Sequence, residues 1–369
     1  MTRRHTRQRR PRGRSRVGER YDAEVGPVAH GGHCVVRLPA PESRVVFVRH
    51  AVPGERVTLE ITEGTEGDRF WRADAVAVLE PSPDRVQAPC PYAGPGACGG
   101  CDLQHVSLPR QRLLKGEVVR EQLARLAGLE VDVTVEPVPG DQDGLRWRTR
   151  QRFVPLPGGG HGMRKHRSHD VVPVDDCLIA GAAPSHLVRG VPFEVAAGTG
   201  FWQVHPGAPE TLVATVLGML SPQPGESVLD LYAGVGLFAR FLAEAVGPAG
   251  TVTLVEGDAD ACRHAAVNVP GADVLTGDVA DVLAGVAPAQ VDLVVLDPPR
   301  TGAKRAVVEQ VVARKPRAAA YVACDPAALA RDVAIFAEHD YRLASLRAFD
   351  LFPMTHHVEC VALLTRTGP

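Results

Sequence analysis

The sequence of 369 residues is poor in cysteine and lysine and contains no long apolar run. A membrane-spanning helix needs roughly 18 unbroken apolar residues, and no stretch of the chain approaches that length. No apolar segment of the kind found in secretory signals follows the arginine-rich start. Eight cysteines are too few for a disulfide scaffold in a chain of this size. We therefore expect a cytoplasmic, monomeric protein that does not contact a membrane.

Lysine supplies only four of the 41 basic residues. A genome biased toward arginine explains this composition. Arginine also suits phosphate and base contacts, because its planar guanidinium donates two parallel hydrogen bonds. Composition alone does not separate the two explanations.

The formal net charge of −2 is a cancellation. Residues 1–20 hold nine arginines and one acid, Glu19, so they carry +8, while the remaining 32 basic and 42 acidic residues sum to −10. This first stretch mixes Arg, Pro, Gly and Ser without apolar periodicity. We predict that residues 1–20 form a disordered basic tail.

Three further regions follow the tail. Residues 21–80 contain short β-branched runs broken by Gly, Pro and Asp, which is typical of a small, closed, OB-like β-barrel. The pattern of residues 81–195 predicts a small α+β central domain that begins with a Pro- and Gly-rich loop and has short strands from residue 131. Between the loop and these strands, an amphipathic helix is predicted from Leu108 to Leu126, with apolar positions at Leu113, Val118, Leu123 and Leu126. In residues 196–369, continuous apolar strands alternate with helices, so this α/β region predicts a Rossmann-like parallel sheet covered on both faces.

The segment from Val228 to Phe238 reads as a buried strand, a Gly234-x-Gly236 turn and a helix. Glycines let the backbone turn tightly and let a ligand approach a helix N-terminus. Acids are expected at the carboxyl ends of this strand and its neighbours, namely Asp230, Glu256, Asp278 and Asp297.

Two cofactors fit this pattern. A nicotinamide dinucleotide is compatible with Gly234-x-Gly236-x-x-Ala239. S-adenosylmethionine is favoured by the acid Asp230 on the first strand together with the Asp297-Pro298-Pro299 motif after the fourth. A third interpretation is that Asp230 and Glu256 only cap helices.

Cys324 lies between an apolar strand and a helix that begins with Asp325 and Pro326. The positive end of the helix dipole is expected to lower the pKa of this thiol and favour the thiolate. A cysteine is more often a small buried filler, but this one sits at the same sheet edge as the expected cofactor. We therefore interpret Cys324 as a nucleophile.

The segment from Asp350 to Leu364 offers His356, His357 and Glu359 before a final apolar strand. Uracil is a poor nucleophile at C5, and thiolate addition at C6 gives an enolate that can attack a methyl sulfonium carbon. A base must then remove the C5 proton. Glu359 is our choice of base, because a carboxylate near a closed pocket can have its pKa raised toward neutrality. An exposed acid at a strand edge is the alternative.

These motifs resemble the TrmA family of RNA 5-methyluridine methyltransferases, and the resemblance extends from about residue 21 to residue 365. The segment from Phe47 to Glu55 resembles the TRAM domain, which is a small RNA-binding barrel. This resemblance points to the branch of the family that carries an iron–sulfur cluster and modifies 23S ribosomal RNA. The resemblance implies that Cys324 is the nucleophile and Glu359 the base. It also implies that S-adenosylmethionine is contacted by Gln203, Tyr232, Glu256, Asp278 and Asp297. Leu237 departs from the Asn of related sequences, which puts one cofactor contact in doubt, and Ala323 replaces a usual Ser.

Four cysteines have a spacing that suits a metal or cluster, namely Cys90, Cys98, Cys101 and the distant Cys177. Spacing alone fits structural zinc as well as a [4Fe–4S] cluster. The family resemblance implies the cluster, although the gap between the first two cysteines is two residues longer than in the family. Cys360 is an alternative fourth ligand.

The stretch from Arg146 to Arg167 holds seven basic residues and no acid. Alternation from Arg146 to Arg152 predicts four cations on one strand face, with Trp147 and Phe153 placed to hold unpaired bases. A solvated strand face is the plain alternative. We predict methylation of uridine C5 in 23S rRNA. A tRNA substrate is the first alternative, and a redox-sensing RNA-binding protein with a vestigial methyltransferase fold is an alternative of another class.

Overall fold

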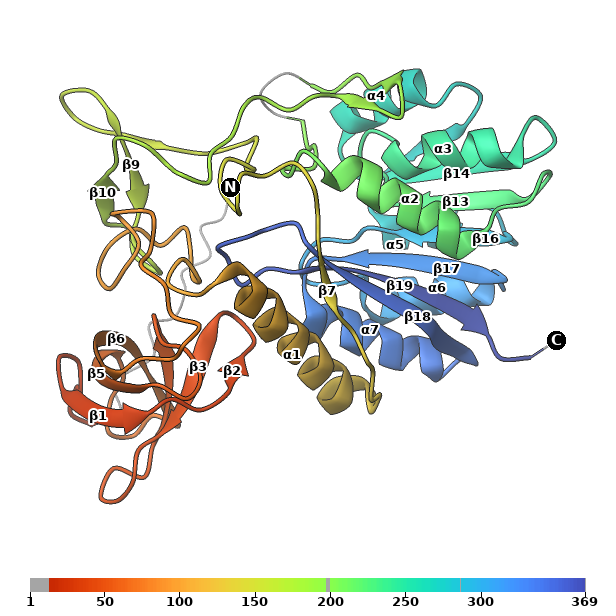
Figure 1. Cartoon of the computed structure of the whole chain (residues 1–369). Coiled ribbons are helices and arrows are strands. Elements are labelled where there is room, and N and C mark those ends of the chain that lie inside the picture. Colours follow the sequence, from red (N-terminus) through yellow and green to blue (C-terminus); the bar gives the residue numbers. More distant parts are fainter. Residues whose placement is uncertain (1–12, 197–199, 286, 369) are drawn as a thin grey trace. The chain divides into compact units, whose positions relative to one another are not determined.

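The computed structural model describes residues 13–196, 200–285 and 287–368. The chain divides into two compact units, which we describe separately (Figure 1). The first unit comprises Met1–Arg110 and Phe153–Asp176, and the second comprises Gln111–Arg152 and Cys177–Pro369. The region predicted as a central domain over residues 81–195 is therefore shared between the two units instead of forming a third.

A six-stranded sheet forms the body of the first unit, in the order β1-β5-β6-β4-β3-β2. All neighbours are antiparallel except β4 and β6. Alternate side chains of β4 and β5 point into one apolar core. The strands are β1 (Arg20–Glu24), β2 (Val28–Ala29), β3 (His33–Arg37), β4 (Val45–Arg49), β5 (Arg56–Glu63) and β6 (Phe70–Glu80).

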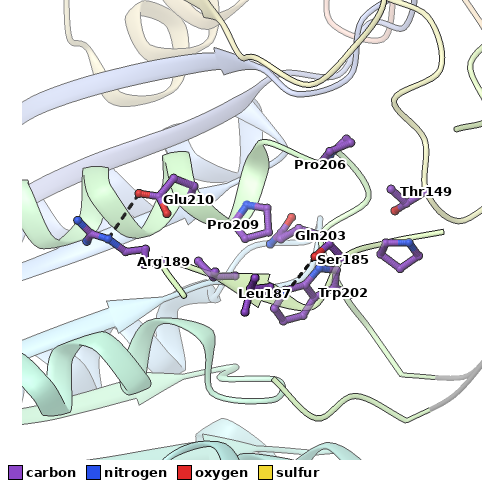
Figure 2. A pocket seen from close by; sticks show the side chains of 11 residues that line it. Thr149, Ser185, Leu187, Arg189, Trp202, Gln203, Pro206, Pro209 and Glu210 are labelled. Carbon is purple, nitrogen blue, oxygen red and sulfur yellow. Dashed lines mark hydrogen bonds and ion pairs between the residues drawn. The ribbon is translucent and has the colours of Figure 1, made fainter. Parts of the chain in front are cut away.

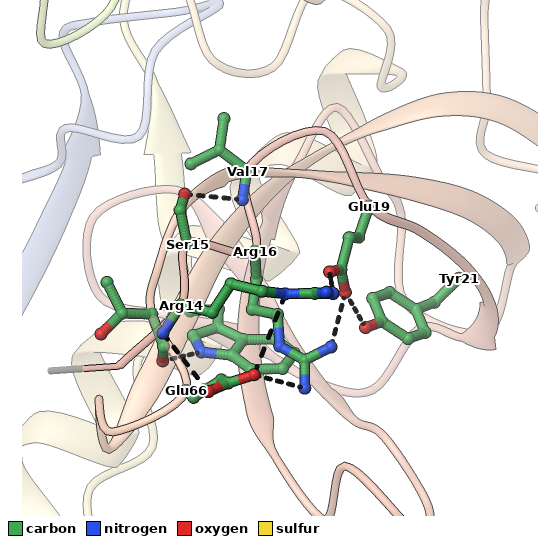
Figure 3. Close-up of polar contacts among 9 residues, drawn as sticks. Arg14, Ser15, Arg16, Val17, Glu19, Tyr21 and Glu66 are labelled. Carbon is green, nitrogen blue, oxygen red and sulfur yellow. Dashed lines mark hydrogen bonds and ion pairs between the residues drawn. The ribbon is translucent and has the colours of Figure 1, made fainter.

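The segment before β1 is ordered on this sheet (Figure 3). Arg16 donates its backbone N–H to the Gly64 carbonyl at 3.0 Å, and its side chain pairs with Glu19 at 2.9 Å. The Arg16 guanidinium also lies over the Trp71 ring, 5.5 Å from its centroid. The expected disorder of residues 1–20 therefore does not extend to residues 13–20, and residues 1–12 lie outside the described part of the chain.

The remainder of the first unit contains the cysteine segment, which runs from Cys90 to Cys101, and a small three-stranded sheet in the order β10-β9-β8. Gly99 donates its backbone N–H to the Arg164 carbonyl at 3.0 Å, so the cysteine segment is held against β9. The strands are β8 (Val154–Pro155), β9 (His161–Arg164) and β10 (Val171–Pro173).

An eight-stranded sheet organises the second unit, in the order β15-β14-β13-β16-β17-β19-β18-β7. The first five strands are parallel, which confirms the predicted doubly wound arrangement, and β19 runs antiparallel to both neighbours. The strands are β7 (Val135–Pro137), β13 (Ser227–Leu231), β14 (Thr251–Glu256), β15 (Asp273–Thr276), β16 (Leu293–Leu296), β17 (Ala318–Ala323), β18 (Tyr341–Asp350) and β19 (Glu359–Arg366). A separate hairpin joins β11 (Leu187–Val188) to β12 (Val191–Pro192).

Helices cover both faces of this sheet (Figure 1). One core packs β-strand side chains against α1, α5, α6 and α7, and the other packs them against α2, α3 and α4. The helices are α1 (Leu108–Ala127), α2 (Ala208–Leu220), α3 (Leu237–Val246), α4 (Ala259–Asn268), α5 (Val279–Gly285), α6 (Lys304–Ala313) and α7 (Pro326–Ala337). Among the described helices, none combines the length and apolar character needed to cross a membrane.

Helix α1 forms where the sequence predicts it, but its buried face differs from the expected one. Val118 and Leu123 are buried, whereas Leu113 is 56% exposed and Leu126 is 38% exposed. Two polar side chains, Gln111 and Lys115, occupy the buried face instead. They point toward the segment that joins β18 to β19.

Candidate cofactor and catalytic site

The carboxyl ends of β13, β14 and β16 bring the predicted cofactor acids together. Asp230 is fully buried on β13 and accepts a hydrogen bond from the Ala239 N–H at 3.0 Å, so one carboxylate oxygen holds the first turn of α3. Its other oxygen, Oδ1, is buried without a hydrogen-bond donor. Burial, opposed by this one hydrogen bond, raises the pKa of Asp230 to about 8. Asp230 therefore caps a helix and also keeps an acceptor for a ligand.

The glycine turn leaves room beside these acids. Gly234 and Gly236 have φ of 56° and 87°, and Tyr232 has φ of 61°, so the turn uses left-handed backbone at three positions. A Cβ at Gly236 would approach Val269 to 2.7 Å, whereas one at Gly234 would meet nothing within 4 Å. Gly236 is therefore required for packing, and the space over Gly234 is open to a ligand.

The remaining acids are fixed by the turns that carry them. Glu256 accepts the N–H groups of Gly234 and Asp258 at 2.9 and 2.8 Å, and Asp278 accepts the Ala280 N–H at 2.9 Å. Burial, with a smaller contribution from the charge of Glu256, raises the pKa of Asp297 to about 7. The structure thus places Glu256 against the glycine turn and gathers its charge with those of Asp230 and Asp297.

Gln203 lines a cavity of about 100 Å³ that is bounded by the β11–β12 hairpin, the start of α2 and Thr149 (Figure 2). Its neighbour Trp202 packs edge to face on His186, with ring centroids 5.2 Å apart. Among the described residues that line this cavity there are none of the four acids above. The predicted cofactor contact of Gln203 stays a prediction.

Cys324 and Glu359 lie at the same end of two adjacent strands. The antiparallel pairing of β17 and β19 ends at Ala323 opposite Cys360, so the next positions on the two strands are Cys324 and Glu359. Glu359 is 5% exposed and begins β19, whose position between β17 and β18 encloses it. The predicted nucleophile and the predicted base therefore meet at one edge of the sheet.

The pKa shift of Cys324 differs from our expectation, whereas that of Glu359 has the expected direction. Burial, and next the carboxyl of Glu359, raise the pKa of the Cys324 thiol to about 12, while the Arg300 guanidinium opposes the shift. The predicted lowering of this pKa by the helix dipole is wrong, because desolvation outweighs the helix N-terminus formed by Asp325. Burial and the charge of Asp297 also hold the pKa of Glu359 well above its usual range.

Arg300 and the two histidines flank this pair. The Arg300 guanidinium lies 3.2 Å from Nε2 of His357, and the rings of His356 and His357 are 4.0 Å apart. The loop that carries Arg300 is anchored by Asp332 of α7, which accepts hydrogen bonds from the Ala303 N–H at 2.7 Å and the Tyr321 hydroxyl at 2.6 Å. Asp332 was not among the residues predicted for the site.

Leu237 begins α3 and is 7% exposed in the apolar core of the α2–α4 face. At the position where the family resemblance leads us to expect a polar Asn, this chain places an apolar side chain in the core. The side-chain contact to the cofactor that an Asn could provide is not available from Leu237.

The predicted cysteine ligands are not gathered into a metal site. No group of three or more His, Cys, Asp or Glu side chains among the described residues is arranged to hold a metal ion. Within the first unit, Gln104 accepts the Cys90 N–H at 3.0 Å and donates to Sγ of Cys101 at 3.2 Å. Cys177 belongs to the second unit.

The basic stretch does not form the predicted strand face. Residues 146–152 lie outside the strands, and their side chains bond to carbonyls, with Arg150 donating to the Gly200 carbonyl at 2.7 Å. Trp147 is 1% exposed and stacks on His205, so it is not available for an RNA base, whereas Phe153 is 37% exposed. The prediction of four aligned cations is wrong, because local turns replace the strand.

The later part of this stretch belongs to the first unit. There it lines a cavity of about 510 Å³. Its basic lining residues are Arg49, Arg72, Lys165 and Arg167. Three acids, Glu63, Asp74 and Asp170, line the same cavity, and Glu63 pairs with Arg72 and Arg167 at 3.3 and 3.6 Å, so the lining is mixed in charge.

Family models match three parts of the chain. The model described as tRNA (Uracil-5-)-methyltransferase matches residues 285–367, the Methyltransferase small domain matches residues 211–320, and the TRAM domain matches residues 14–76. The last match coincides with the six-stranded sheet of the first unit and includes the ordered residues before β1.

Curated relatives extend over nearly the whole chain. An uncharacterized RNA methyltransferase of Streptomyces coelicolor is 45% identical, over 95% of this chain and 93% of its own. The 23S rRNA (uracil(1939)-C(5))-methyltransferase RlmD of Shewanella amazonensis is 30% identical, over 90% of this chain and 93% of its own. Among solved structures, the tRNA (uracil-54, C5)-methyltransferase of Pyrococcus abyssi, in complex with S-adenosyl-L-homocysteine, has a TM-score of 0.68 at 21% identity and covers 94% of this chain and 100% of its own. This last likeness shows a shared fold.

Proposed function

The chain belongs to the family of S-adenosylmethionine-dependent RNA (uracil-5-)-methyltransferases, and from this premise we propose that it methylates a uridine of 23S ribosomal RNA through a covalent adduct on Cys324. The RlmD relatives support the substrate, because they are 30 to 32% identical over at least 90% of this chain. The barrel of the first unit matches the TRAM domain and would supply an RNA-binding module.

The acids at the sheet edge fit the cofactor. S-adenosylmethionine, when bound, supplies an electrophilic methyl carbon on a positively charged sulfur. The open space over Gly234 and the donor-free Oδ1 of Asp230 provide room and an acceptor for it. Glu256 and Asp297 add negative charge beside that space, which favours a cationic ligand.

Cys324 starts the reaction. Its sulfur bonds to C6 of uracil while the thiol proton passes to water, and the electrons of the C5=C6 bond move onto C5 and O4 to give an enolate. C5 would then take the methyl group of bound S-adenosylmethionine, whose sulfur–methyl bond would break to release S-adenosylhomocysteine. Because burial raises the pKa of this thiol to about 12, the proton is proposed to leave as the sulfur adds to C6 and not beforehand.

Glu359 completes the reaction. Its carboxylate takes the proton from C5, the C5=C6 bond re-forms, and the bond from C6 to the Cys324 sulfur breaks. The raised pKa of Glu359 makes its ionised form a stronger base than an ordinary surface carboxylate. The single observation that carries the proposal is that Cys324 and Glu359 end facing strands at the edge where the cofactor acids lie.

One assay tests the substrate and the adduct. The protein is incubated with tritiated S-adenosylmethionine and separately with 23S rRNA and tRNA transcripts. We expect label in 23S rRNA and its loss in Cys324→Ala, with Cys34→Ala as a matched control because Cys34 is buried in the barrel core. A Glu359→Gln variant should accumulate a protein–RNA adduct that survives denaturation. Label unaffected by Cys324→Ala would exclude the mechanism, and label only in tRNA would exclude the rRNA substrate.

We also propose that Cys90, Cys98, Cys101 and Cys177 hold a [4Fe–4S] cluster. The spacing and the family resemblance support this, and the hydrogen bonds from Gln104 to Cys101 and from the Gly100 N–H to Cys98 are of the kind that stabilise thiolate sulfur. Three of these cysteines belong to the first unit and Cys177 to the second. Anaerobically purified protein with stoichiometric zinc and no iron would refute this proposal.

A further inference from the structure

The segment that joins β18 to β19 delivers Glu359 to the site, and it is unusually well buried for a connection between strands. Leu351, Met354, Thr355 and Val358 are each at most 6% exposed. The Thr355 hydroxyl donates to the Phe352 carbonyl at 2.8 Å, and Met354 adopts a left-handed φ of 65°. The polar backbone groups of a buried turn need hydrogen-bond partners, and some of these partners come from another element.

Helix α1 provides these partners from more than 230 residues earlier in the chain. Lys115 donates from Nζ to Oδ1 of Asp350 at 2.5 Å and to the Phe352 carbonyl at 3.0 Å. Gln111 accepts the Met354 N–H at 2.9 Å and donates to the Met354 sulfur at 3.3 Å. Positions four apart lie on one face of a helix, so both side chains reach the segment together.

The contact between helix α1 and the 350–359 segment is almost completely buried. The side chains of Lys115 and Asp350 are 1% and 2% exposed, and Gln111 is fully buried. A buried ion pair is a poor source of stability, because desolvating both charges offsets their attraction, but it enforces one geometry where apolar side chains would permit several. The segment it fixes begins at Asp350 and ends at Glu359.

We propose that Lys115 and Gln111 are positioning residues for the catalytic base. They hold both the start and the middle of the 350–359 segment, so that Glu359 enters β19 opposite Cys324. This inference rests on the proposed function, in which Glu359 removes the C5 proton. It assigns to helix α1, which carries none of the predicted catalytic residues, a role in the last chemical step.

The test separates positioning from stability. In the double variant Lys115→Met with Asp350→Leu, apolar side chains of similar volume replace the buried pair, so the protein should fold with a near-native melting temperature. A displacement of about 1 Å at a reacting group can lower a rate about a hundred-fold. We expect kcat for methyl transfer to fall by at least about ten-fold, KM for S-adenosylmethionine to stay unchanged, and the protein–RNA adduct to accumulate as in Glu359→Gln.

Two further variants keep the test decisive. Gln111→Leu removes the second anchor without touching a charge, and it should also raise the adduct fraction. Arg120→Met is the matched control, because Arg120 lies on the same helix and bonds the Val133 carbonyl at 2.9 Å without touching the segment. Wild-type kcat and no adduct in folded double variant and in Gln111→Leu would overturn the inference. Failure of the wild type to methylate RNA would instead overturn the proposed function.

Discussion

The raised pKa values at the sheet edge predict that S-adenosylmethionine binding depends on pH. The carboxyls of Asp297 and Asp230 have pKa values of about 7 and about 8 in the free protein, mainly because they are buried. A cationic ligand binds better when these groups are ionised. Affinity should therefore increase as pH rises toward these pKa values, and binding should release protons.

The magnitude follows from the two pKa values. If Asp297 alone must ionise, its ionised fraction rises from about a tenth at pH 6 to about a half at pH 7, so the Kd falls about five-fold. If Asp230 must ionise as well, its fraction rises about nine-fold, and the combined effect is at most about fifty-fold. The window lies below the pKa of an α-amino group, about 7.7–8.0, so the ligand keeps its charge.

Isothermal titration calorimetry at pH 6, 6.5 and 7 measures the effect, and buffers of different ionisation enthalpy count the protons released. Asp297→Asn should flatten the dependence. Asp292→Asn is the control, because Asp292 precedes β16 at the opposite end of the same strand and bonds Ser227. S-adenosylhomocysteine lacks the sulfonium charge and should show a weaker dependence. A wild-type Kd that is constant from pH 6 to 7 would refute the reasoning.

Two further predictions concern buried carboxylates that organise each unit. Asp332→Asn leaves fewer acceptors for the Ala303 N–H and the Tyr321 hydroxyl, so the free energy of unfolding should fall by about 1–3 kcal/mol. The kcat should also fall, because the loop that carries Arg300 loses its anchor. An unchanged melting temperature and kcat would contradict this prediction. Glu55 is fully buried and accepts hydrogen bonds from the Val52 N–H and from Arg85. Glu55→Gln should therefore destabilise the first unit by about 2–4 kcal/mol in thermal unfolding, while S-adenosylmethionine affinity stays unchanged, and loss of that affinity would contradict it.

Elements of the α/β region were predictable because their signals are local. Strand β13 is apolar from Val228 to Leu231 except at Asp230, and the glycine turn follows at once, so both are located by sequence alone. The same holds for Asp325 and Pro326, which begin α7 as an N-cap and first-turn proline do. The strand order then brings the acids to one edge.

The basic stretch shows where local signals fail. Alternation from Arg146 to Arg152 fits a strand, but Arg146 has a left-handed φ of 56° and its guanidinium lies 3.3 Å from the Ala180 carbonyl. Carbonyl acceptors supplied by distant parts of the chain therefore decided this conformation. Trp147 is likewise buried by a distant part of the chain, because the His205 ring stacks on it.

The sequence by itself determined the chemistry that is available: a thiol before a helix, a carboxylate before a strand, and acids after parallel strands. Only the tertiary structure decided the pKa values of those groups and the contacts that fix their positions. Desolvation depends on every neighbour of a group, so the raised pKa of the Cys324 thiol could not be read from the helix start beside it. The contact between Lys115 and Asp350 joins positions 235 residues apart, which no local pattern encodes, because only folding brings the helix to that segment.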